Sequence, residues 1–197
     1  MAFAARSKFQ FPLVCLVAGV ITLCVCCHRP PQLKPQSAPI TVEPGRQTLT
    51  GRVVSVADGD TITVLDSSET QHRIRLEGID APELHQAFGS RSKQNLSELV
   101  YGKDVTVVYY KTDQYGRLVG KILLDGRDIN LEQVRAGMAW HYKQYESEQS
   151  PADRELYAKA EDEARAAHRG LWIDPNPVEP SEFRREQQEE HRSRRLN

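Results

Sequence analysis

The amino-acid sequence predicts an α+β fold in which five strands form a small barrel that is accompanied by three helices. Two observations support this fold class. Between residues 49 and 124, five runs rich in β-branched residues are separated by turns that contain Gly and Asp, as expected for short strands. In three other stretches, apolar residues recur at helical spacing, and these stretches begin at capping residues or end near glycines.

The first three predicted strands form a meander whose ends carry acidic residues. They cover residues 50–56, 61–65 and 72–79. A turn at Asp58-Gly59 separates the first strand from the second. Pro82 ends the third strand because it lacks a backbone N–H donor, so Asp80 and Glu83 leave the sheet together at its rim. Asp60 and Asp80 thus lie at strand ends that can meet, which indicates a two-carboxylate site.

Three helices and two further strands complete the predicted fold. The strands are expected at residues 104–110 and 117–124, and the helices at residues 90–100, after Asn130 as N-cap, and from Ser150-Pro151 to about residue 169. The Glu161/Arg165 pair in the third helix indicates a solvated face. Trp172 is expected to pack on the core. Five strands with one inserted helix match a small Greek-key barrel of the oligonucleotide/oligosaccharide-binding (OB) type.

The composition is typical of a soluble globular domain and limits the possible functions. The chain has 197 residues and a formal net charge of −1, which excludes a uniformly basic nucleic-acid binder. All four cysteines lie in the first 27 residues, so the domain has none for disulfides, thiol catalysis or a zinc site. The length fits one domain with extensions, and we expect a monomer.

Both ends of the chain are expected to lie outside the domain. Residues 1–27 combine a basic start with an uncharged apolar run, which is typical of a signal peptide. The same run is at the short end for a membrane anchor, and lipoprotein processing at Cys26 or Cys27 is a further alternative. Residues 28–46 form a proline-rich linker, and residues 177–197 a charged, mobile tail. The sequence predicts an exported protein that is extracellular, periplasmic or membrane-anchored.

Three separated motifs carry the residues that are suited to catalysis. They are Asp58-Gly-Asp-Thr61, Arg75…Asp80-Ala-Pro-Glu83 and Asp113-Gln-Tyr-Gly-Arg117. In their order and spacing these motifs resemble the staphylococcal nuclease, or thermonuclease, family over about residues 47–176. The resemblance implies an OB-type barrel and a calcium-dependent nuclease whose substrates are DNA and RNA.

The acidic residues of the first two motifs are candidate metal ligands. Calcium and magnesium prefer hard oxygen ligands, which Asp60 and Asp80 supply as carboxylates. The resemblance implies Ca²⁺, with the Ala81 carbonyl as a third ligand, although the type member of the family carries threonine at that position. A lone Asp-Gly-Asp is more often only a hairpin turn. We expect these carboxylates to be exposed at the rim and to repel one another, so that their removal leaves the fold intact.

The arginines and Glu83 match the catalytic residues of the family. A guanidinium offers a planar fork of donors, so Arg75 and Arg117 can clamp a phosphodiester and stabilise the charge that develops during attack. The alternative is surface pairing with Glu77 or Asp113. Glu83 matches the general base or water-orienting carboxylate. Among the aromatics, Tyr115 and Tyr142 are candidates for contacts with a nucleotide base.

Three classes of function remain compatible with these residues. An exported Ca²⁺-dependent nuclease with little sequence specificity is favoured, because all five charged residues of the candidate site occur together. A non-catalytic nucleic-acid-binding module of the same fold would not require them. A membrane-anchored scaffold, which would use the linker and the tail, is the third possibility.

Overall fold

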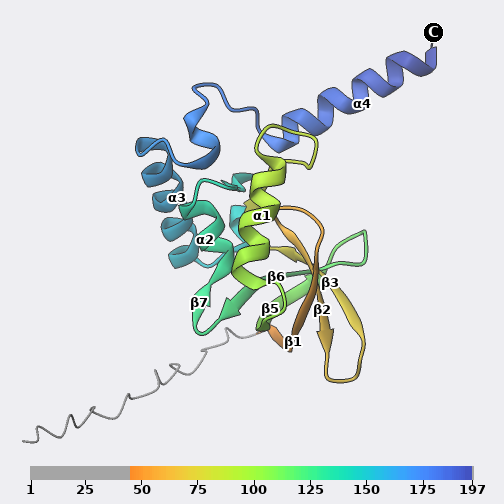
Figure 1. Ribbon diagram of the computed structural model, residues 1–197, viewed down its shortest axis with the longest axis vertical. Coiled ribbons are helices and arrows are strands. Elements are labelled where there is room, and N and C mark those ends of the chain that lie inside the picture. Colours follow the sequence, from red (N-terminus) through yellow and green to blue (C-terminus); the bar gives the residue numbers. More distant parts are fainter. Residues whose placement is uncertain (1–44, 197) are drawn as a thin grey trace, which may run out of the picture. The chain divides into compact units, whose positions relative to one another are not determined.

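The computed structural model describes residues 45–196, so the predicted export segment and most of the predicted linker lie outside the described residues. The five long strands are β1 (Gln47–Val56), β2 (Thr61–Asp66), β3 (Gln71–Leu76), β5 (Asp104–Thr112) and β6 (Leu118–Leu124). Three strands of two residues each are added to them: β4 (Ile79–Asp80), β7 (Arg127–Asp128) and β8 (Trp140–His141). Figure 1 shows how the strands curve around a common interior.

Strand pairing closes the sheet into a barrel. The order is β3-β2-β1-β5-β6, and each of these neighbouring pairs is antiparallel. A parallel pairing of β3 with β6, with Arg75 opposite Val119, joins the two ends. The predicted fold class, an α+β protein with a five-stranded OB-type barrel, is thereby confirmed.

Period-two alternation explains why these strands form a core. One side chain in two along β2 and β3 faces the interior, and the fully buried aliphatic residues of the barrel include Ile62, Val64, Ile74, Val107 and Ile122. Each such side chain contributes roughly 1.5–3 kcal/mol when it is transferred out of water. Packing of these aliphatic side chains, rather than any covalent link, therefore holds the barrel together.

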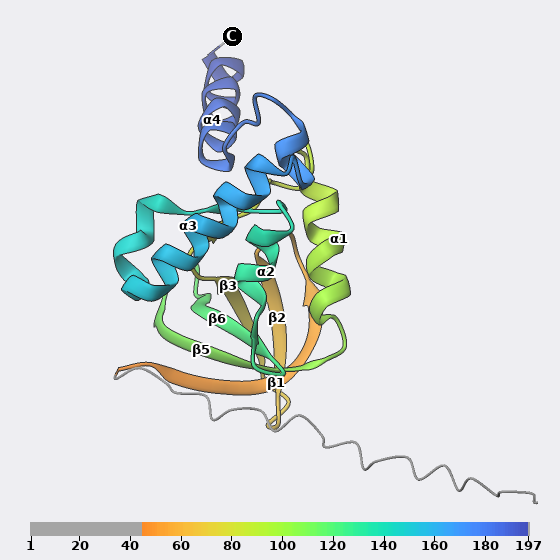
Figure 2. The same ribbon diagram turned by 90° about the vertical axis from the view of Figure 1, so that its left-hand side faces the viewer.

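Within residues 45–196, four α-helices and two 3₁₀ turns accompany the barrel. They are α1 (Gly89–Val100), α2 (Ile129–Arg135), α3 (Pro151–Ala166) and α4 (Pro180–Leu196), with 3₁₀ turns at Lys143–Glu148 and Gly170–Ile173. Figure 2 shows α2 and α3 over one end of the barrel. The predicted cap of α3 is confirmed, because the Ser150 side chain accepts a hydrogen bond from the Asp153 N–H.

The predicted N-cap of α2 was wrong. Asp128 caps this helix by accepting from the Leu131 N–H at 3.1 Å. Asn130 is instead buried, where its amide donates to the carbonyls of Glu77 and Gly120 and accepts from the Ile122 N–H. Tertiary hydrogen bonds therefore outweigh the local capping preference of Asn130, and they fasten the chain after β3 to β6.

The third predicted strand is interrupted before it reaches the acidic motif. Strand β3 ends at Leu76, and the chain turns at Gly78, whose φ of 74° favours glycine. The short strand β4 follows and pairs with β8, with Asp80 opposite Trp140. This turn takes Asp80 away from the barrel sheet and fixes it against the segment that follows α2.

Two charged segments differ from their predictions. The expected mobile tail contains α4, a helix of 17 residues whose side chains from 185 to 195 are exposed. Glu161, expected on a solvated face of α3, is buried at 1% exposure. Its carboxylate accepts from the His141 N–H and pairs with Lys143 and Arg165, which gives a buried charge the partners it requires.

Trp172 packs on the core as expected. Its ring lies edge-on to Trp140, with 5.2 Å between ring centroids, and the Arg165 guanidinium lies 3.6 Å from its ring centroid.

Within residues 45–196, no helix is both long enough and apolar enough to cross a membrane.

Candidate active site

The turn between β1 and β2 places the first acidic motif against α1. The Asp60 N–H donates to the Asp58 carboxylate at 3.0 Å, and the Gly59 carbonyl accepts from the Gln133 amide at 2.7 Å. A Cβ on Gly59 would lie 1.9 Å from the Ser92 hydroxyl oxygen and 2.7 Å from the Ala81 Cβ. Only glycine fits this close approach, which brings Asp60 beside the residue that follows Asp80.

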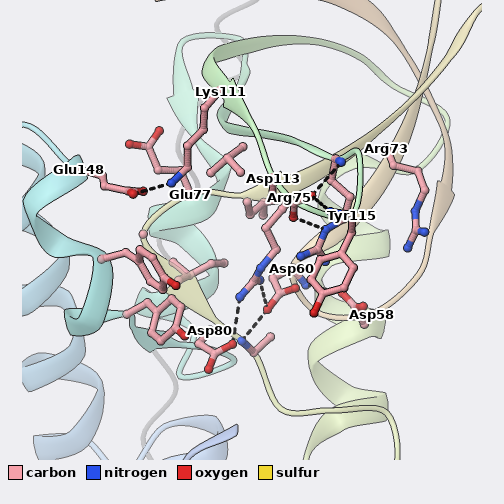
Figure 3. A pocket seen from close by; sticks show the side chains of 18 of the residues that line it. Asp58, Asp60, Arg73, Arg75, Glu77, Asp80, Lys111, Asp113, Tyr115 and Glu148 are labelled. Carbon is pink, nitrogen blue, oxygen red and sulfur yellow. Dashed lines mark hydrogen bonds and ion pairs between the residues drawn. The ribbon is translucent and has the colours of Figure 1, made fainter. Parts of the chain in front are cut away.

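Asp60 and Asp80 meet at the edge of the barrel, as the sequence predicts, with Arg75 between them (Figure 3). One guanidinium nitrogen of Arg75 is paired with Asp60, and the other donates to Asp80 at 2.9 Å. The Ala81 N–H donates to the Asp60 carboxylate at 2.7 Å. These contacts assemble two acidic residues and one basic residue at a single point.

The prediction of exposed, mutually repelling rim carboxylates was wrong. Asp60 and Asp80 are only 7% and 2% exposed. Arg75, expected as an alternative to pair with Glu77, instead neutralises both aspartates, while Glu77 is paired with Arg46 at 2.7 Å. The aspartates therefore form a buried, charge-compensated cluster, in which the loss of any one partner leaves an uncompensated charge.

Burial and charge shift the proton affinities of this cluster. Burial, assisted by the nearby Asp60 carboxylate, raises the pKa of Asp58 to about 6. Burial also raises the pKa of Asp80, although hydrogen bonds from Arg184 and the charge of Arg75 act in the opposite direction. Burial acts to lower the pKa of Arg75, but the two aspartates beside it raise that pKa overall. Arg75 consequently stays charged.

Glu83 lies on the loop between β4 and α1, next to the aspartate pair. Its side chain is 39% exposed and its carboxylate accepts from Arg184 of α4 at 2.8 Å. The sequence analysis missed Arg184, which also donates to both carboxylate oxygens of Asp80. A single arginine of a highly charged segment about a hundred residues away carries no local signal of this role.

Arg117 and the candidate aromatic residues line the same cavity as Arg75, which has a volume of about 770 Å³. The Arg117 Nε donates to Asp113 at 2.7 Å, which is the surface pairing considered as an alternative. Burial alone would raise the pKa of Asp113, but hydrogen bonds from the Arg117 backbone and side chain lower it overall. Tyr115 is 71% exposed, and Tyr142 packs against Tyr145 with ring centroids 5.1 Å apart.

The cavity wall opposite the acidic cluster contains charged pairs that were not predicted. Lys111 of β5 pairs with Glu148, and Figure 3 shows this pair across the cavity from Asp58. Glu77, which also lines the cavity, accepts two hydrogen bonds from Arg46, at 2.7 and 2.9 Å, and the Arg46 guanidinium lies over the Tyr110 ring. The cavity is therefore lined with both charge signs, and its basic side chains suit a polyanionic substrate.

The donor set suits a hard divalent cation. Asp60 and Asp80 already hold a cationic group between them, and both present oxygen ligands. Within the described residues, no group of three or more Asp, Glu, His or Cys side chains is arranged as a metal site. Two carboxylates are a sparse set, which fits an ion that keeps several of its waters or takes substrate oxygens.

A small OB-type barrel that carries paired carboxylates and arginines at one cavity is suited to the hydrolysis of phosphodiester bonds. Comparison with known proteins agrees. The family described as "Staphylococcal nuclease homologue" matches residues 73–174. The chain belongs to the staphylococcal nuclease family, and it is a nuclease that hydrolyses phosphodiester bonds.

Several bacterial relatives match most of the chain. An "Uncharacterized endonuclease" of Haemophilus influenzae is 44% identical over 142 residues, which cover 72% of this chain and 76% of the relative. "Micrococcal nuclease" of Shigella flexneri is 42% identical over 144 residues, which cover 68% and 80%. "Protein ParB" of Escherichia coli is 40% identical over 156 residues, which cover 75% and 85%.

Proposed function

We propose that this nuclease is exported, depends on Ca²⁺, and cleaves both DNA and RNA with little sequence specificity. The observation that carries this proposal is the acidic cluster, in which Asp60 and Asp80 converge on one positive group with Glu83 at the same edge. A site built to hold a cation between two buried aspartates, beside a third carboxylate that is partly exposed, matches metal-assisted hydrolysis.

Asp60, Asp80 and the Ala81 carbonyl are the proposed ligands of the cation. All three are oxygen donors, and the flexible coordination of Ca²⁺ tolerates a site in which waters complete the shell. When bound, the cation would polarise the phosphate and stabilise negative charge in the transition state. Arg75 now occupies the position between the aspartates, so cation binding would free its guanidinium to contact the substrate.

The side chains around this position can each take one part in hydrolysis. Glu83 accepts a proton from a water whose oxygen attacks the phosphorus, while the bond from phosphorus to the leaving nucleoside oxygen breaks. The leaving oxygen receives a proton from solvent. Arg75 and Arg117 hold the non-bridging phosphate oxygens, because a guanidinium fork binds two oxygens at once and stays charged.

Low sequence specificity follows from the kinds of contact that the cavity offers. Arginines bind the phosphate backbone, which is the same for every sequence. Tyr115 and Tyr142 line the cavity and would stack on bases, a contact that every base can make. The cavity thus offers contacts that do not depend on base sequence.

A digestion panel tests the proposed activity. Single- and double-stranded DNA and RNA of several sequences are incubated with the protein in Ca²⁺, in Mg²⁺ and in chelator. We expect cleavage of all four substrates in Ca²⁺, none in chelator, and no dominant cleavage motif. Restriction to one nucleic acid, a strong motif, or equal activity in chelator would each refute the corresponding part of the proposal.

Export is proposed from the first 27 residues, whose composition is typical of a signal peptide or an anchor. We expect cell fractionation to recover the protein outside the cytoplasm, either released or attached to a membrane. Replacement of the apolar run by a polar sequence of equal length is the matched control and should retain the protein inside. Recovery of the unaltered full-length chain in the soluble cytosol would refute export.

A further inference from the structure

The C-terminal helix reaches the acidic cluster through its first turns. One guanidinium nitrogen of Arg184 in α4 donates hydrogen bonds to Glu83 at 2.8 Å and to one carboxylate oxygen of Asp80 at 3.2 Å. The second nitrogen donates to the other carboxylate oxygen of Asp80 at 3.0 Å. One guanidinium thus bridges the proposed metal ligand and the proposed base. Figure 1 shows the rest of α4 projecting away from the barrel, so its contact with the site is made at its beginning.

A second contact ties the same loop to the same C-terminal segment. The Gln86 amide oxygen accepts from the Glu83 N–H at 3.1 Å, and the Gln86 amide nitrogen donates to the Val178 carbonyl at 2.7 Å. Glu83 is therefore held at two points, at its backbone through Gln86 and at its carboxylate through Arg184. Gln86 is bonded to Val178, which lies just before α4, and Arg184 lies near the beginning of α4.

This contact differs from an ordinary surface ion pair. Exposed pairs contribute little to stability, because two mobile side chains must be ordered in high dielectric. Here one partner, Asp80, has a side chain that is only 3% exposed, and the guanidinium engages both of its oxygens. Arginine keeps its positive charge at physiological pH, so the bridge is charge-assisted.

Glu83 needs an external partner to hold one position. It lies in a loop after Pro82, outside any helix or strand, and its side chain is 39% exposed. A glutamate in such a place samples many rotamers, and fixing it in one of them costs conformational entropy. A base that is displaced by about 1 Å can lose roughly a hundredfold in rate. The Arg184 bridge supplies the missing constraint and sets Glu83 beside Asp80.

We propose that Arg184 is a positioning residue of the nuclease site, and that α4 forms part of the catalytic unit by holding the Glu83 carboxylate next to Asp80. The inference rests on the proposed roles of Asp80 and Glu83. Arg184 acts through Glu83 and need not touch the substrate. The C-terminal segment, which lies at the end of the domain in sequence, is on this basis required for efficient turnover.

A double-mutant cycle on the full chain tests this role. Wild type, Arg184→Ala, Glu83→Gln and the double variant are compared for kcat and KM on a short DNA oligonucleotide in saturating Ca²⁺. We expect Arg184→Ala to lower kcat about 10- to 100-fold with KM changed less than about threefold. In the Glu83→Gln background the same replacement should change kcat less than about twofold, because the residue through which it acts is already disabled.

Arg185→Ala is the matched control. Arg185 neighbours Arg184 on α4 but pairs with Glu182 of the same helix, where both side chains are at least half exposed. Its removal should leave kcat and KM at wild-type values. Gln86→Ala, which loosens the backbone of Glu83 without altering charge, should lower kcat in the same direction as Arg184→Ala.

The outcomes separate this inference from the proposed function. A wild-type kcat for Arg184→Ala would overturn the positioning role. So would a double variant whose loss of kcat equals the product of the losses in the two single variants. If that product is found and Arg184→Ala also raises KM, the result would indicate that Arg184 contacts the phosphate directly. If Glu83→Gln itself retains full activity, the proposed base is wrong and the inference falls with it.

Calcium titration by calorimetry gives a readout besides activity. A positioning role predicts that Arg184→Ala binds Ca²⁺ within about threefold of wild type. Binding that is tighter by about tenfold or more would show instead that Arg184 competes with the cation for Asp80, which would overturn the inference. The thermal midpoint is measured in parallel. A midpoint close to that of wild type, together with reduced kcat, excludes unfolding as the cause.

Discussion

Replacement of Arg75 should destabilise the protein by an amount that depends on calcium. Arg75→Ala removes the side chain that bridges Asp60 and Asp80. Without a divalent cation, the Asp60 carboxylate then faces the Asp80 carboxylate, and β3 no longer supplies either of them with a positive charge. With Ca²⁺ bound, the cation itself would compensate both aspartates. We therefore expect a large loss of stability in chelator and a much smaller loss in Ca²⁺.

The magnitude follows from burial. The side chains of Arg75, Asp60 and Asp80 are 14%, 10% and 3% exposed. Removing one partner of a buried ion pair typically costs about 3–5 kcal/mol. For a domain of this size that loss corresponds to a fall in Tm of roughly 10 °C. Asp80 keeps Arg184 as a partner, so the lower end of the range is the expectation.

Urea unfolding of wild type and Arg75→Ala, each in chelator and in excess Ca²⁺, measures this dependence. Arg73→Ala is the matched control, because Arg73 belongs to the same strand and lines the same cavity but has an exposed side chain. The control should change stability by less than about 0.5 kcal/mol in either condition. An equal loss for Arg75→Ala with and without Ca²⁺ would refute the interpretation of the aspartate pair as a cation site.

Three further substitutions test other parts of the structure. Arg117→Lys should lower kcat by about 100-fold or more with little change in KM, because lysine keeps the charge but loses the fork, and a wild-type rate on an oligonucleotide would exclude the catalytic role. Burial raises the pKa of Asp58 from 3.8 to about 6, so its contribution to folding stability is fully present below pH 4 and is lost as the pH rises through 6. Asp58→Asn should thus stabilise the calcium-free protein at pH 7 by up to about 3 kcal/mol, and urea midpoints with the same pH dependence as wild type would argue against it. Glu161→Ala leaves the buried His141 N–H without its acceptor and should lower the free energy of unfolding by about 1–3 kcal/mol. The exposed control Glu163→Ala should lower it by less than about 0.5 kcal/mol, and equal urea midpoints for the two variants would contradict the buried role of Glu161.

The barrel was predictable because its signals are local. Alternating β-branched runs and Asp-Gly turns specify short strands that pair with their neighbours along the chain. The interruption of β3 at Gly78 was not predicted, because it depends on Asp80 pairing with Trp140, which is 60 residues later. The cap of α2 was misassigned for a similar reason, since Asn130 bonds to Glu77, 53 residues earlier, and to Gly120 of β6 rather than to its own helix.

The candidate site was predictable in its composition but not in its electrostatics. Strand ends bring Asp60 and Asp80 together, and the sequence pattern indicated this correctly. Their burial around Arg75 depends on how α1 and the Gly59 turn pack, which no short motif encodes. Arg184 reaches the site through a helix that composition alone suggested to be mobile. Long-range contacts of charged side chains are the part that local patterns do not specify.

Cleavage of a labelled DNA oligonucleotide during a calcium titration tests the central claim most directly. Wild type, Asp60→Asn and Asp80→Asn are freed of metal with chelator, and Ca²⁺ is then added in steps. We expect wild-type activity to be absent at first and to rise to saturation, while both variants stay at least about a hundredfold slower at every concentration. Wild-type cleavage that persists in chelator, or full rescue of either variant by Ca²⁺, would contradict the assignment of Asp60 and Asp80 as the cation site.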